Sequence, residues 1–133
     1  DKDVIYLQDS EVIVEGIKFY GTPWTPVFYN WAFMDYEPEL ALQFACIPDD
    51  IDVLISHGPP HSILDLNDKK EHCGSIALYE RVKRLPKLKH HIFGHIHHSY
   101  GIEKIDDVTF HNVCSLNDRY EYQNPPQVIE IIK

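Results

Sequence analysis

Histidines stand in two short segments whose spacing could hold metal ions. His57 lies in Ile-Ser-His-Gly-Pro-Pro (55–60), and His95 and His97 lie in Phe-Gly-His-Ile-His (93–97). Side chains two residues apart in an extended segment face the same way, so His95 and His97 can each touch a different ion of a pair about 3.5–4 Å apart. Because neutral imidazole suits Mn, Fe and Zn ions, the pattern indicates a site for divalent metal.

Each histidine segment follows a short run that predicts a strand. Residues 51–56 read Ile-Asp-Val-Leu-Ile-Ser and residues 90–93 read His-His-Ile-Phe. A nearly continuous apolar run is typical of a strand inside a covered sheet. Open α/β sheets build their sites at the carboxyl ends of their strands, so we expect His57, His95 and His97 to converge there.

An isolated His-x-His pair has a simpler interpretation as two histidines in a polar loop. So short a motif matches by chance in many proteins. In this chain both histidine segments follow a predicted strand and both contain a glycine beside the histidine, which favours metal ligation. The two interpretations stay open on the residues alone.

The remaining pattern predicts a mixed α/β sandwich. Strands alternate with helices and the chain finishes in strands, with no internal repeat. Ser75 is a suitable N-cap for the second helix. The expected elements are a hairpin over 10–21 that turns at Glu15-Gly16, helices over 37–47 and 75–85, a second hairpin over 102–105 and 108–114, and a closing strand over 127–132.

Composition narrows the classes of partner. The chain has 133 residues, a usual size for one domain, and a net charge of -9. Nucleic-acid binding needs clustered Lys and Arg, so none is expected. No apolar run is long enough to span a membrane and no signal-peptide pattern opens the chain. The three separated cysteines, Cys46, Cys73 and Cys114, are typical of reduced thiols, so we expect a cytoplasmic protein.

The combination of Ser-His-Gly-Pro-Pro (56–60) with Phe-Gly-His-Ile-His (93–97) resembles the late motifs of calcineurin-like metallophosphoesterases. The similarity is closest to one branch of them, the metallophosphoesterase-domain-containing proteins, and it extends over nearly the whole chain. Further segments that resemble this branch, in the same order, are 6–10, 21–26, 29–33, Cys73-Gly74, Tyr100-Gly101 and Asn-Pro-Pro at 124–126.

The resemblance implies a two-metal phosphoesterase. In the family an aspartate bridges two divalent ions, which hold a water or hydroxide that attacks phosphorus. By this resemblance His57 and His95 would bind one ion and His97 the other. The metals could be Mn, Fe, Zn or Mg. The substrate would be a small phosphate ester, and the branch suggests a phosphodiester such as a cyclic nucleotide. His98 adjoins the site and could meet the substrate phosphate.

The family's earlier motifs, D-x-H, G-D and G-N-H, do not occur in residues 1–133. Asn112, in His-Asn-Val (111–113), is the nearest match to the G-N-H motif, but no glycine precedes it. These motifs would supply the bridging aspartate, the remaining metal ligands and the histidine that assists the leaving group. We therefore interpret residues 1–133 as a single partial metallophosphoesterase domain, the C-terminal part, and expect this chain alone to be inactive.

Two alternatives to a phosphoesterase part remain. The chain could be a non-catalytic truncated homologue, or a small-molecule or metal-binding module. A structural zinc site normally has four ligands, and only three are evident here. A partial domain would leave a sheet edge and apolar area uncovered, so we expect self-association or pairing with the missing N-terminal segment.

The other histidines have plainer expected roles. His61 and His72 are expected to be solvated loop residues. His90 and His91 are expected at the surface, and His111 is expected to be a hydrogen-bonded core or edge residue.

Overall fold

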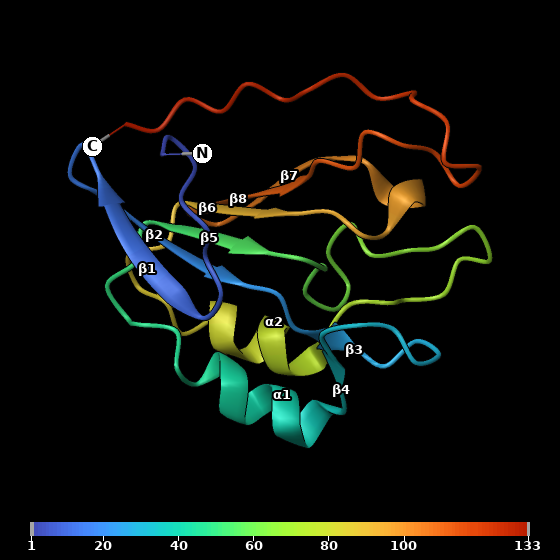
Figure 1. The fold of residues 1–133 in the computed structure, drawn as a ribbon, viewed down its shortest axis with the longest axis horizontal. Coiled ribbons are helices and arrows are strands. Elements are labelled where there is room, and N and C mark those ends of the chain that lie inside the picture. The colour runs from blue at the N-terminus through green and yellow to red at the C-terminus, as the bar shows by residue number, and fades with distance from the viewer. Residues whose placement is uncertain (1, 133) are drawn as a thin grey trace.

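The computed structural model describes residues 2–132, and its centre is a six-stranded mixed sheet (Figure 1). Within residues 2–132 no helix is long and apolar enough to cross a membrane. The elements are β1 (Ser10–Val14), β2 (Ile17–Thr22), β3 (Thr25–Pro26), β4 (Met34–Asp35), α1 (Glu37–Phe44), β5 (Val53–Ser56), α2 (Ile76–Val82), β6 (His90–Phe93), the 3-10 turn η1 (His97–Ser99), β7 (Gly101–Ile105) and β8 (Val108–Asn112).

The strands of the main sheet lie in the order β1-β2-β5-β6-β8-β7. The central pairs β2–β5, β5–β6 and β6–β8 are parallel, and the two outer pairs are antiparallel. β5 and β6 are therefore neighbours that point the same way. Their carboxyl ends, which carry the two histidine segments, meet at one edge of the sheet.

Both predicted hairpins are present. The β1–β2 turn is made by Glu15 and Gly16, with φ of 50° and 80°. Two consecutive residues with positive φ match the twist of the flanking strands, as in the tight turns that favour hairpins. The β7–β8 hairpin turns at Asp106 and Asp107, and its ladder ends at Asn112 rather than at residue 114.

Hydrogen bonds connect the N-termini of the two helices. As predicted, Ser75 caps α2, because its Oγ accepts a hydrogen bond from the Leu78 N–H at 3.1 Å. The Glu37 carboxylate, at the start of α1, accepts from the N–H groups of Ile76 and Ala77 at 3.1 and 2.9 Å. These N–H groups have no partner inside the helix, so Glu37 satisfies them. Both helices end three residues earlier than predicted.

The hydrophobic core lies between the helices and one face of the sheet (Figure 1). Apolar side chains from the central strands meet the buried sides of α1 and α2, so this face is the closed one. The core residues that these elements contribute are Tyr20, Leu40, Phe44, Leu54, Leu78, Val82, Phe93 and Phe110.

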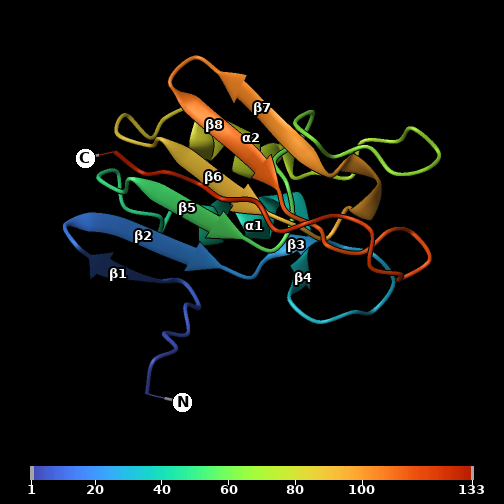
Figure 2. The same cartoon turned by 90° about the horizontal axis from the view of Figure 1, so that it is seen from above.

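The prediction of a closing strand over 127–132 is wrong. The segment forms no strand and instead crosses the sheet face opposite the helices (Figures 1 and 2). Val128 and Ile132 are exposed, whereas Ile129 and Ile131 are half-buried, so the alternating pattern reflects one side lying against the sheet. β8 already has β6 and β7 on its two sides, and no edge beside it is open to a further strand.

Hydrogen bonds of Gln127, one of them to a histidine, hold the C-terminal segment on this face of the sheet. Gln127 Nε2 donates to the carbonyls of Asn112 and Gly101 at 2.9 and 3.4 Å. Its Oε1 lies 3.1 Å from His111 Nδ1, and His111 Nε2 lies 3.1 Å from His90 Nδ1. His111 is thus a buried, hydrogen-bonded strand residue, as expected.

His91 is fully buried, so its expected surface position is wrong. It belongs to β6 and packs edge-on against Phe93 and Phe110. Its Nε2 lies 2.8 Å from Ser56 Oγ, which donates its own hydrogen to the Gly58 carbonyl at 2.7 Å. His91 Nε2 must therefore carry the proton. Burial lowers the pKa of His91 from its usual 6.5 to about 3, because a charged ring would lose its hydration.

The buried neutral state of His91 predicts acid sensitivity. As pH falls below 6.5 the unfolded chain protonates this histidine and the folded chain does not, so the free energy of unfolding decreases. In His91→Leu the slope of that free energy between about pH 6.5 and 4 should be shallower by up to ~1.4 kcal/mol per pH unit. Urea titrations at several pH values measure it, and equal slopes in the two proteins would contradict the assignment.

Candidate metal centre

His57 and His95 lie side by side at the ends of β5 and β6. Their ring centroids are 4.6 Å apart, with the ring planes inclined by 41°. The backbone joins the two segments, because the Gly94 N–H donates to the His57 carbonyl at 3.0 Å. The structure therefore brings together two predicted ligands that are distant in the sequence.

The turn after β5 needs a glycine because the Thr25 side chain approaches it closely. A Cβ at Gly58 would lie 2.7 Å from Thr25 Oγ1 and 3.6 Å from His95 Cδ2, and the first of these contacts is too short for a real side chain. His95 itself has φ of 71°, in the left-handed region that non-glycine residues rarely adopt. Such backbone strain is often found at functional sites.

Burial keeps both rings neutral. It lowers the pKa of His95 to about 4, with smaller contributions from His57 and His97, and burial also lowers the pKa of His57. A neutral imidazole is the form that binds a metal ion, so this pair fits a divalent cation. The pair offers two nitrogen ligands and carries no negative charge near neutral pH.

His97 turns toward a neighbouring loop and begins η1 instead of continuing an extended segment. Its Nδ1 lies 2.8 Å from the Asn117 carbonyl, and its ring packs edge-on against Tyr120. A carbonyl can only accept, so Nδ1 carries the proton and Nε2 keeps its lone pair. Metal-binding histidines are commonly oriented by such a bond through their other nitrogen.

His98 is half-exposed, and its Nδ1 lies 3.1 Å from Asp118 Oδ2. The roles of His57, His95 and His97 as metal ligands and of His98 as a substrate contact stay predictions. His57 and His95 are adjacent in space. His97 and His98 follow them in η1.

Comparisons with known proteins agree with the resemblance seen in the sequence. No family model matches the chain. The chain is 43% identical over 131 residues to human metallophosphoesterase domain-containing protein 1, and equally identical to the mouse protein. It is 35% identical over 130 residues to a UPF0046 protein of Caenorhabditis elegans. The matches to the human and nematode proteins cover 96% and 97% of this chain.

The chain belongs to the metallophosphoesterase-domain-containing family. The chain spans 40% of the length of the human relative and 33% of the length of the nematode relative. A solved structure with 21% identity superposes with a TM-score of 0.58, covering 81% of this chain and 45% of the other. That likeness confirms the α/β fold.

Asn112 has a structural role that the sequence did not reveal. Its side chain is fully buried at the end of β8. Its Nδ2 donates to the Leu64 carbonyl at 3.1 Å and to the Ile96 carbonyl at 2.9 Å, and its Oδ1 accepts from the Cys114 N–H at 3.1 Å. One amide thus holds three loops together, including the turn between His95 and His97.

Sequence reasoning also missed a repeated loop. Residues 66–72 read Leu-Asn-Asp-Lys-Lys-Glu-His and residues 116–122 read Leu-Asn-Asp-Arg-Tyr-Glu-Tyr, so the expectation of no repeat is wrong. In each loop the first and last residues form an antiparallel bridge, and the asparagine side chain accepts two backbone N–H bonds. The shared Leu-Asn-Asp and the Glu that follows were the available signal.

The two repeated loops flank η1 and hold it from both sides. Ser99 Oγ donates to the Leu66 carbonyl in the first loop, at 2.6 Å. His97 and His98 bond to Asn117 and Asp118 in the second loop. The turn that follows the paired histidines is therefore fixed between them.

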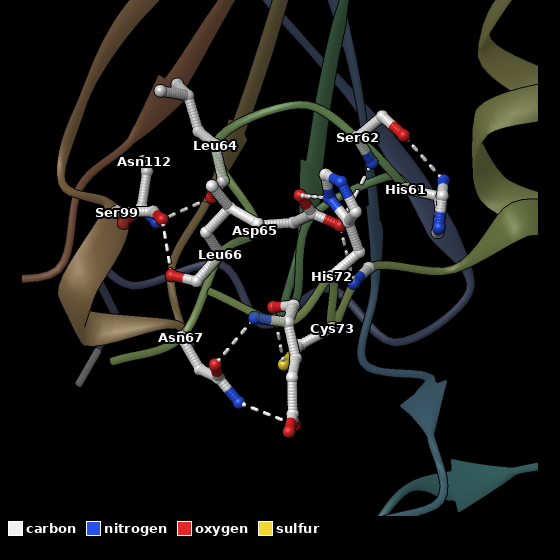
Figure 3. Close-up of polar contacts among 12 residues, drawn as sticks. His61, Ser62, Leu64, Asp65, Leu66, Asn67, His72, Cys73, Ser99 and Asn112 are labelled. Atoms are coloured by element: carbon white, nitrogen blue, oxygen red, sulfur yellow. Dashed lines mark hydrogen bonds and ion pairs between the residues drawn. The ribbon is translucent and has the colours of Figure 1, made fainter. Parts of the chain in front are cut away.

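A further group lies among residues that were expected to be solvated loop histidines. Within residues 2–132, only His61, Asp65 and His72 bring one ligand atom each within 4.8 Å of one another. His72 Nδ1 lies 2.7 Å from Asp65 Oδ1, and this carboxylate is almost completely buried. Figure 3 shows the three side chains in the loop that follows the His57 segment.

The three bonds of Asn112 predict a large loss of stability on truncation. In Asn112→Ala two carbonyls and one N–H lose their partner in the interior, so the free energy of unfolding should fall by about 3 kcal/mol, near ~1 kcal/mol for each bond. Urea unfolding at neutral pH measures this loss. The control is Asn124→Ala, which removes one bond to the Cys114 carbonyl and should cost about 1 kcal/mol. Equal losses of unfolding free energy in the two variants would show that the three bonds of Asn112 do not contribute more than the single bond of Asn124.

Proposed function

We propose that this chain supplies part of the metal site of a metal-dependent phosphoesterase that hydrolyses a phosphodiester or phosphomonoester. The observation that carries the proposal is the pairing of His57 with His95 at the ends of two adjacent parallel strands. Family membership supports the reaction class, because the relatives are named for a metallophosphoesterase domain.

The proposed roles follow from the positions of the free ring nitrogens. His57 and His95 hold one divalent ion, and His97 offers Nε2 to a second because its Nδ1 is bound to the Asn117 carbonyl. When bound, the two ions supply a water or hydroxide nucleophile and neutralise charge on the phosphate. His98 presents Nε2 beside the same turn. Because its Nδ1 faces the Asp118 carboxylate, Nε2 donates to a phosphate oxygen in the doubly protonated form of the ring.

Charge explains why three histidines are an incomplete site. Neutral imidazoles do not offset the charge of two dications, whereas a bridging carboxylate would do so and hold the ions close together. The chain also has a net charge of -9, which repels an anionic substrate unless bound cations reverse the local field. We therefore propose that the complete site includes acidic ligands from the D-x-H, G-D and G-N-H motifs of the family.

The low pKa of His95 predicts the pH dependence of metal binding. Protons compete for this ring only near its pKa of about 4, so Mn²⁺ affinity should be nearly constant between about pH 8 and 6 and should weaken below about pH 5. Calorimetric titration with Mn²⁺ across this range measures it. A steep loss that begins near pH 7 would contradict the low pKa of His95.

A chromogenic phosphodiester with Mn²⁺ tests the proposed activity. The chain alone should show no turnover above background, and a chimera that places the three family motifs ahead of this chain should be active. His57→Ala or His97→Ala in the chimera should reduce kcat by about a hundredfold or more, because each removes a ligand. His98→Ala should mainly raise KM. Equal activity in the chain and the chimera would contradict the proposed need for the motifs.

A further inference from the structure

The buried Asp65 carboxylate lies at the centre of an organised polar group. It is 1% exposed, and its Oδ2 accepts hydrogen bonds from the N–H groups of Ser62 and Gly74 at 2.9 and 3.0 Å. The side-chain partner of Oδ1 is His72, at 2.7 Å. A buried carboxylate is costly unless hydrogen bonds or a positive charge compensate it, and here the side chain that contacts it is a histidine.

Two imidazoles lie next to this carboxylate. The rings of His61 and His72 have centroids 5.0 Å apart and are inclined by 39°. His61 Nδ1 is bonded to Ser62 Oγ at 2.7 Å, so the ring has a fixed partner and a second nitrogen that remains available. The ligand atoms of His61, Asp65 and His72 all lie within 4.8 Å of one another, a separation that a small local movement could close around one ion.

We propose that His61, Asp65 and His72 bind one divalent transition-metal ion, with Zn²⁺ as the probe. Two imidazoles and one carboxylate are a ligand set that zinc and related ions accept, whereas Ca²⁺ and Mg²⁺ prefer oxygen alone. The site shares no residue with the His57–His95 pair. His72 is 46% exposed, so solvent can reach the group and supply a further ligand.

The backbone connects this site to the paired histidines. The carbonyl of Leu64, which precedes Asp65, accepts a hydrogen bond from Asn112 (Figure 3). The same Asn112 amide also donates to the Ile96 carbonyl. The carbonyl of Leu66, which follows Asp65, accepts from Ser99 in η1. An ion that orders Asp65 therefore also supports the turn carrying His95 and His97, so this second site stabilises the first without contacting it.

Zinc titration of the metal-free 133-residue chain tests the proposal. Bound Zn²⁺ is counted by elemental analysis after equilibrium dialysis, for the unaltered chain and for His61→Gln, His72→Gln and His95→Gln. We expect His61→Gln and His72→Gln each to lose one ion, or to bind it at least about tenfold more weakly. His95→Gln should keep this ion, which separates the result from the fate of the proposed phosphoesterase site.

The matched control is His98→Gln. His98 is half-exposed and also pairs with a carboxylate, Asp118, but within residues 2–132 this pair has no third ligand nearby. It should leave the ion count unchanged. Circular dichroism in the absence of metal checks that each variant is folded, and the substituted side chains are polar and not in the core. Thermal unfolding then provides a second measurement: Zn²⁺ should raise the Tm of the unaltered chain and of His98→Gln more than that of His72→Gln.

The proposal is overturned if His61→Gln and His72→Gln bind as much Zn²⁺ as the unaltered chain with the same affinity. It is also overturned if all bound zinc disappears in His95→Gln alone. In either case the contact between Asp65 and His72 is only a hydrogen bond that orders the loop.

Discussion

The buried amide of Asn112 is the interaction on which the arrangement of the site depends. β5, β6 and β8 end at the same edge of the sheet, and the loops that leave them carry unpaired carbonyls into the interior. Asn112 satisfies the carbonyls of Leu64 and Ile96 with its two N–H hydrogens and the Cys114 N–H with its oxygen. An interior polar group without a partner is costly, so these loops are held in one relative position.

Burial of imidazole is the second organising feature of this edge. His91 is enclosed between the sheet and the helices and, through Ser56, is linked to the carbonyl of Gly58 in the turn after His57. His95 and His57 are partly withdrawn from solvent, which favours their neutral forms. The same desolvation that makes a charged histidine unfavourable leaves a nitrogen lone pair ready for a cation. The stability of the fold and the proposed metal binding therefore depend on one physical cause.

The local elements were largely predictable because their signals lie within a few residues. The Glu15-Gly16 turn, the Ser75 cap and β6 over His90–Phe93 all have the expected positions. The prediction of a closing strand failed because its alternating pattern is shared by any extended segment lying on a surface. Only the sheet order shows that β8, the preceding strand, already has a neighbour on each side. His91 was misplaced because a histidine in a strand carries no sign of which face is covered.

The sequence by itself determined the strand–histidine segments, the family and the acidic charge, since these follow from residue types and their order. It also placed glycine where the backbone must turn beside His57. Only the tertiary structure decided which distant groups meet: His57 with His95, Asn112 with Leu64 and Ile96, and His72 with the buried Asp65. Such contacts depend on strand order and loop closure, and the energy of each is realised only when segments far apart in the chain have packed together.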